Sequence, residues 1–100
     1  MLYTIYVELH VQDIPQDSAE AMLDAHRQWF KEHFEASRFV MVGPCLDVAG
    51  TGMIIAQGES VEAMHELIKG DVYYADQLAT YTIHPFDVKM FNPDIANYIG

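Results

Sequence analysis

Histidine and carboxylate side chains are the clearest candidates for chemistry in this chain, which contains five histidines and fifteen acidic residues. Imidazole exchanges a proton near neutral pH without a large perturbation, so a histidine beside a carboxylate can relay protons. Tyr6, Glu8 and His10 follow one another at intervals of two residues. On a strand they share one face, where Tyr6 can donate a hydrogen bond to a developing enolate or phenolate oxygen. A solvated strand end would carry the same residues, so both interpretations stay open.

A metal centre would need ligands from several segments. Glu8, His10 and His84 can in principle form a set of two histidines and one carboxylate, if their strands present them on one side. His26 and His33 lie about 10.5 Å apart along a helix, which is too far to share one ion. No His-Glu-x-x-His motif is present. We therefore predict no metal ion.

Nucleophilic and nucleotide-dependent chemistry also lack support. Cys45 follows Gly43-Pro44 without a neighbouring cation to activate its thiol, and no Gly-x-Ser-x-Gly elbow occurs. No glycine-rich loop leads into a helix, as a phosphate-binding loop would. We therefore expect no cofactor. As the single cysteine, Cys45 cannot form an intramolecular disulfide, which is typical of a reducing cytoplasm.

The length and charge of the chain limit its partners. One hundred residues fit one compact domain. A net charge of −10, with only five lysines and arginines scattered along the chain, argues against nucleic acid and anionic membranes. No apolar stretch approaches the roughly 18 residues of a membrane span. We expect a cytoplasmic protein that binds neither nucleic acid nor membrane.

Periodicity predicts the elements that position these residues. Alternating or β-rich runs predict four strands, over residues 2–11, 38–42, 51–57 and 79–86. Apolar spacings of three and four predict two helices, over residues 18–36 and 60–69. The apolar stripe of the first helix is expected to run through Met22, Leu23, Trp29, Phe30 and Phe34.

The order strand, helix, strand, strand, helix, strand is the split β-α-β or ferredoxin-like arrangement (βαββαβ) of the α+β class. Its helices cover one face of an antiparallel sheet and leave the other face open. Homodimerisation through the open face would cover it economically. The mixed polar residues of that face would then line an interior cleft suited to a small molecule.

Several short segments in this predicted order point to a known family. They are Tyr3-Thr4-Ile5-Tyr6 on the first strand, Asp24-Ala25-His26 near the start of the first helix, Val42-Gly43-Pro44 at the end of the second strand, Asp71 after the second helix and His84-Pro85-Phe86 on the last strand. Together they resemble the YCII-related (YciI-like) family over roughly residues 1–90. The resemblance implies a domain over residues 1–88 and a C-terminal extension over residues 89–100.

The resemblance also implies a dimeric α+β barrel with a histidine and an aspartate in a cleft. On this sequence they correspond to His26 as general base and Asp71 as the group that orients it. Members are small cytoplasmic proteins, and some are associated with breakdown or biosynthesis of small cyclic or hydroxylated aromatic compounds. The Arg-Pro pair that usually precedes the family histidine is replaced here by Leu23-Asp24-Ala25, and Asp-Pro becomes Asp71-Val72.

We therefore predict a small, cofactor-independent lyase or isomerase in which His26 moves a proton on such a metabolite. Tyr6, Glu8, His10 and Tyr74 would shape the substrate-binding cleft between two subunits. Two alternatives stay open: a non-catalytic small-molecule-binding or accessory dimeric protein, and an interaction domain whose open sheet only dimerises. In both, His26 can be a core histidine packed among the apolar residues of its helix.

Overall fold

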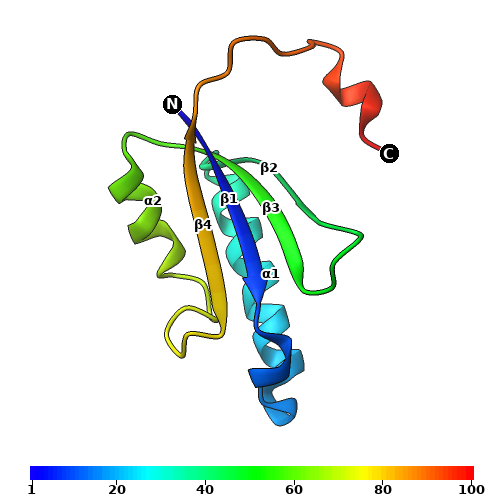
Figure 1. The fold of residues 1–100 in the computed structure, drawn as a ribbon, viewed down its shortest axis with the longest axis vertical. Helices are drawn as coiled ribbons and strands as arrows, with labels where there is room; N and C mark the ends of the chain where they lie inside the picture. Colours follow the sequence, from blue (N-terminus) through cyan, green and yellow to red (C-terminus); the bar gives the residue numbers. More distant parts are fainter.

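The computed structural model describes residues 1–100 and contains the predicted strands and helices in the predicted order (Figure 1). They are β1 (Leu2–Leu9), α1 (Ala19–Glu35), β2 (Phe39–Pro44), β3 (Thr51–Gln57), α2 (Val61–Ile68) and β4 (Ala79–Phe86). Short 3-10 turns, η1 (Val11–Asp13) and η2 (Gln16–Ser18), connect β1 to α1, and η3 (Ile95–Tyr98) lies in the tail. The α+β, ferredoxin-like prediction is confirmed.

The strands form one antiparallel sheet in the order β2-β3-β1-β4. In Figure 1, α1 lies behind β1 and β3 and α2 lies beside β4; both helices contribute to the core on one face of the sheet, which leaves the front face uncovered. In the register, Ile5 of β1 pairs with Ile54 of β3 and Ile83 of β4, and these residues face the helices. Tyr6, the next residue along β1, pairs with Met53 and faces the open side.

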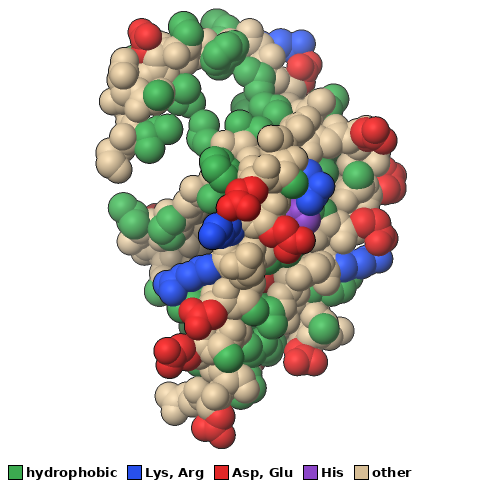
Figure 2. Space-filling model, turned by 180° about the vertical axis from the view of Figure 1, so that it is seen from behind, with side chains coloured by type: hydrophobic (Ala, Val, Ile, Leu, Met, Phe, Trp, Pro, Cys, Tyr) green, Lys and Arg blue, Asp and Glu red, His purple; other side chains and the backbone are tan.

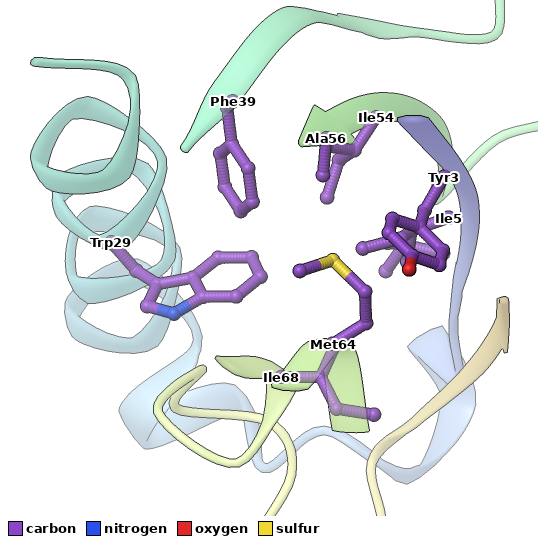
Figure 3. Packing of buried hydrophobic residues seen from close by; sticks show 9 residues of the cluster. Tyr3, Ile5, Trp29, Phe39, Ile54, Ala56, Met64 and Ile68 are labelled. Carbon is purple, nitrogen blue, oxygen red and sulfur yellow. The ribbon is translucent and has the colours of Figure 1, made fainter. Parts of the chain in front are cut away.

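The core fills the space between the sheet and the two helices. Figure 3 shows Met64 of α2 at its centre, between Trp29 of α1 and Ile5 of β1. Burying such side chains stabilises the fold because apolar surface leaves water. The cluster of buried residues comprises Tyr3, Ile5, Val7, Trp29, Phe39, Ile54, Ala56, Met64 and Ile68.

The predicted apolar stripe of α1 is wrong at its C-terminal end. Phe34 is 55% exposed, and His33 packs in its place against Trp29 and Phe39. Each residue advances about 100° around a helix, so His33 lies about 20° from the direction of His26, whereas Phe34 lies about 80° away. The stripe therefore follows His26, Trp29 and His33, and two of its members are histidines.

The two helices begin differently. Ser60 caps α2, because its hydroxyl accepts a hydrogen bond from the amide of Ala63 at 3.1 Å. Ser18 precedes α1 without such a bond, and the turn η2 leads directly into the helix. None of the helices is both long and apolar enough to cross a membrane.

The chain leaves the sheet after Phe86. Residues beyond β4 arch away from the strands and end in the turn η3 (Figure 1). Most of the large apolar side chains in this tail are exposed, among them Met90, Phe91, Tyr98 and Ile99.

The free energy of unfolding should fall in mild acid, because the folded protein disfavours protonation of His33. Burial and the positive charge of Arg38, whose Nε donates to Nδ1 of His33 at 2.8 Å, lower the pKa of His33, while Glu32 opposes them. The unfolded chain, where this pKa is near 6.5, then takes up a proton at higher pH than the folded chain. The stabilising effect is therefore complete above pH 6.5 and is lost as the pH falls through the folded-state value.

We expect His33→Gln to flatten the fall in unfolding free energy below pH 6.5, measured by urea denaturation at a series of pH values. His65→Gln, on the exposed side of α2, is the matched control and should leave the slope as in the wild type. An unchanged slope in His33→Gln would contradict this assignment.

Candidate active site

Among the histidines and carboxylates of the chain, only His26 and Asp71 are buried. His26 lies on the sheet-facing side of α1. Asp71 follows α2, where the amides of Gly70 and Asp71 donate to the carbonyls of Leu67 and Ile68 and close the last turn. This turn brings the Asp71 side chain to His26, although 45 positions separate the two residues in the sequence.

The carboxylate of Asp71 accepts two short hydrogen bonds. Nδ1 of His26 lies 2.7 Å from Oδ1, and the hydroxyl of Tyr81 on β4 donates to Oδ2 at 2.6 Å. Burial and the bond to Asp71 raise the pKa of Tyr81, so this hydroxyl keeps its proton at neutral pH. An ionised carboxylate only accepts hydrogen bonds, so Nδ1 of His26 carries the hydrogen. In the neutral ring, Nε2 then retains its lone pair.

Aromatic rings surround the His26 imidazole. Trp29 stacks on it with 6.1 Å between ring centroids, and Phe30 and Tyr73 make T-shaped contacts at 4.5 and 5.0 Å. Two of these rings come from the same helix, and Tyr73 comes from the loop that also carries Asp71. Packing on these sides and the bond to Asp71 hold the imidazole in one orientation.

A cleft of about 460 Å³ opens between α1 and the hairpin of β2 and β3, and His26 lines it. The one buried side-chain nitrogen or oxygen without a partner is Nε1 of Trp29, so the unpartnered Nε2 of His26 is reached by solvent. His26 therefore borders a space that a small molecule can enter. The other lining residues are Val7, Leu9, Leu23, Arg27, Phe30, Val42, Gly43, Pro44, Gly50, Thr51 and Gly52.

Glycines keep the hairpin side of the cleft open. Gly52 pairs with Val7 and faces the helices, so a side chain at this position would project into the cleft. Gly50 has a φ of 74°, in the left-handed region that favours glycine, and its carbonyl accepts from the amide of Leu9 at 2.8 Å. Backbone rather than side chains therefore forms much of this wall.

The structure does not bring Tyr6 and Glu8 to this cleft. Both lie on the open face of the sheet, whereas Val7, between them in β1, lines the cleft on the helix face. Within one chain the sheet therefore separates these two side chains from His26. The interior cleft expected between two sheets is not the cleft that His26 lines.

His10 and Tyr74 lie outside the cleft as well. The ring nitrogens of His10 are 3.0 Å from the carbonyl of Gln77 and 2.7 Å from the hydroxyl of Thr80, so His10 ties the end of β1 to the start of β4. Tyr74 is exposed on the loop before β4. Its ring centroid lies 6.1 Å from that of Tyr81, next to the buried pair but on its outer side.

The candidate metal ligands do not converge. Glu8 pairs with Thr80, whereas His84 pairs with Thr4, so the two candidates lie four residues apart along β1. No group of three or more histidine, cysteine or acidic side chains lies close enough together to hold a metal ion.

Sequence reasoning missed Tyr81 and Arg27. Tyr81 and Ile83 both lie on the core face of β4. The one sequence signal for the role of Tyr81 is that a buried tyrosine hydroxyl needs a hydrogen-bond partner. The arginine that usually precedes the family histidine is absent here, but Arg27 lines the cleft from the position after His26.

Removing the second donor to Asp71 should destabilise the fold. Tyr81→Phe leaves one carboxylate oxygen buried without its partner, which costs about 1–3 kcal/mol of unfolding free energy at neutral pH. Tyr74→Phe removes the same hydroxyl from an exposed ring and serves as the control, with an expected change below about 0.5 kcal/mol. Urea denaturation measures both, and equal values for the two variants would refute the role given to Tyr81.

Solved structures with the same fold include two enzymes. The 5-chloro-2-hydroxyhydroquinone dehydrochlorinase from Burkholderia phenoliruptrix, in complex with 2,5-dihydroxybenzoquinone, matches with a TM-score of 0.63 and 17% identity, over 87% of this chain and 94% of that chain. An antibiotic biosynthesis monooxygenase matches with a TM-score of 0.52 and 10% identity, over 88% of this chain and 100% of that chain. These similarities show the fold alone, the ferredoxin-like α+β arrangement.

A search of curated proteins finds no match to the chain. The YCII-related domain, by contrast, matches residues 1–87, which include all strands, both helices and the His26–Asp71 pair. The family expected from the short segments is therefore confirmed, and this chain belongs to the YCII-related domain family.

Proposed function

We propose that this protein is a small, cofactor-independent lyase or isomerase that uses His26 and Asp71 to transfer a proton on a small cyclic or hydroxylated aromatic metabolite. One observation carries the proposal. Nδ1 of His26 is held by the buried carboxylate of Asp71 at 2.7 Å, and the same residue lines a cleft. This is the arrangement that a histidine general base requires.

The proposed proton transfer uses the contacts among His26, Asp71 and Tyr81. Nε2 of His26 removes a proton from a hydroxyl or carbon of the bound ring, and the electron pair left behind moves into the ring system. In a lyase reaction the proton is returned to the ring carbon that bears the leaving group, and the leaving group then departs with its bonding electrons as a second ring hydroxyl loses its proton. In an isomerisation the proton returns to a different atom and nothing leaves. The Asp71 carboxylate stabilises the imidazolium that forms, and Tyr81 holds Asp71 in place.

The size and lining of the cleft support a small ring compound as the ligand. A volume of about 460 Å³ lies within the range of small-molecule sites, and most of the lining side chains are apolar. Phe30 and Leu23 can pack on the faces of a ring, while His26 and Thr51 offer polar contacts. The dehydrochlorinase with the same fold acts on a hydroxylated ring, which is consistent with this class.

The open face of the sheet supports homodimerisation. Met41, Met53 and Phe86 on this face are 37%, 39% and 44% exposed in the single chain. Two such faces packed together would remove this apolar surface from water. In this arrangement Tyr6 and Glu8 lie at the subunit interface, and residues 89–100 form an extension outside the domain.

A non-catalytic small-molecule-binding protein is the second candidate. No carboxylate, lysine or tyrosine lines the cleft beside His26, so a separate general acid is missing from it. A binding protein needs no such acid, whereas an enzyme must then return the proton through His26 itself or through water.

Turnover of 5-chloro-2-hydroxyhydroquinone, followed by chloride release, tests the proposal. We expect His26→Ala and Asp71→Asn to lower the rate at least about 100-fold, because the base is lost or held in the wrong tautomer. His65→Ala, an exposed histidine, is the control and should keep the wild-type rate. Calorimetric titration with 2,5-dihydroxybenzoquinone, run on the same samples, measures binding separately.

The two readouts separate the candidates. Chloride release that depends on His26 supports the enzyme, and binding that depends on His26 without turnover supports the binding protein. A wild-type chain that neither binds nor turns over these compounds contradicts both.

Gly52, on the hairpin side of the cleft, offers an independent test of whether the ligand binds there. Gly52→Val should fill part of the cleft and weaken binding of 2,5-dihydroxybenzoquinone about tenfold or more relative to Gly52→Ala. Both variants place a Cβ at 3.2 Å from the carbonyl oxygen of Gly43, so their difference reports on cleft volume rather than on strain in the hairpin. Equal affinities in these two variants would place the ligand elsewhere.

A further inference from the structure

Arg27 is the one positively charged side chain that lines the cleft. It follows His26 on α1, and it is exposed whereas His26 is buried. The side chain takes part in no ion pair and donates no hydrogen bond within the chain. Lys69, Lys89 and Arg38, by contrast, each contact a neighbouring side chain. The guanidinium of Arg27 therefore has all its donors free at the edge of the cleft.

The charge of the rest of the molecule makes this arginine unusual. The chain has fifteen acidic residues and a net charge of −10. Figure 2 shows the helix-covered side, where acidic side chains outnumber the few basic ones. Such a surface repels a small anion, so an anionic ligand needs a local positive charge to offset that repulsion.

The charge of Arg27 also reaches the aromatic surroundings of His26. Burial and the Asp71 carboxylate raise the pKa of Tyr73, and the positive charge of Arg27 opposes that rise. Tyr73 lies 5.0 Å from the His26 ring. Arg27 and His26 line the same cleft from adjacent positions of α1, so a ligand beside His26 also meets the charge of Arg27.

We propose that Arg27 binds an ionised oxygen of the ligand, so that the site selects small rings that are anionic at neutral pH, such as phenolates, enolates or ring carboxylates. The inference rests on the proposed function, since it assigns a substrate class to the same cleft. The planar guanidinium can donate two parallel hydrogen bonds to one ionised oxygen or to a pair of them. With that oxygen held by Arg27, the ring lies across the cleft and presents its reacting atom to Nε2 of His26.

Binding of two ligands of similar size but different charge tests this assignment. 2,5-Dihydroxybenzoquinone is ionised at neutral pH because its hydroxyl groups are vinylogous acids, whereas hydroquinone is neutral. We expect Arg27→Met to weaken binding of the ionised ligand about tenfold or more and to change binding of hydroquinone less than about twofold. Arg27→Lys should retain part of the affinity, because the charge stays and the paired hydrogen bonds are lost.

Lys31→Met is the matched control. Lys31 lies one turn further along α1, is exposed, and does not line the cleft, so the variant removes the same charge from the same helix. Its affinities for both ligands should stay within about twofold of the wild type. Isothermal titration calorimetry at low and high salt gives all these values, and added salt should weaken binding of the ionised ligand in the wild type but not in Arg27→Met.

The outcomes separate this inference from the proposed function. If Arg27→Met binds the ionised ligand as the wild type does while His26→Ala does not, the role of Arg27 is refuted and the function of His26 stands. If binding depends on Arg27 while no turnover is found and His26→Ala has no effect, Arg27 is confirmed and the proton-transfer function fails. A loss equal in Lys31→Met and Arg27→Met would also refute the inference, because it would reflect overall charge.

Discussion

A buried carboxylate with two hydrogen-bond donors is the constraint on which the rest of this structure depends. Asp71 is 2% exposed, and a charge so placed is costly unless it is fully hydrogen-bonded. Its donors come from the two elements between which it lies, His26 of α1 and Tyr81 of β4. Satisfying Asp71 therefore fixes the loop after α2 against both a helix and a strand, and this same requirement determines which nitrogen of His26 is available for chemistry.

Side chains line one wall of the cleft, and backbone forms much of the other. On the helix side, His26 is held among aromatic rings, and Arg27 lines the cleft from the next position. On the hairpin side, Gly50 and Gly52 contribute little more than main chain. The space in the cleft thus comes from missing side chains, and the cleft is lined by one imidazole whose orientation is determined by packing and by a single carboxylate.

Much of the fold could be predicted because alternation along β1 and β4 and the capping residue Ser60 are local signals. His26 and Asp71 were identified through the family resemblance, since no spacing rule links residues 45 positions apart. The sequence could not show whether Tyr6 and Glu8 lie near His26. Periodicity separates the two faces of β1, but it does not say which of these faces the helix that carries His26 covers. Phe34 and His33 differ by one position, and the helical angle between them decided which one packs on the core.

The sheet also acts as a partition. Val7 and Leu9 line the cleft on the helix face of β1. Tyr6 and Glu8, the residues directly before and after Val7, lie on the opposite face. Point substitutions in β1 can therefore change one face of the sheet without the other, since neighbouring codons encode side chains on opposite faces. Insertion or deletion of a single residue within β1 has no such freedom, because a shift of one position exchanges the two sets of side chains. β1 is therefore expected to tolerate substitutions more readily than insertions or deletions.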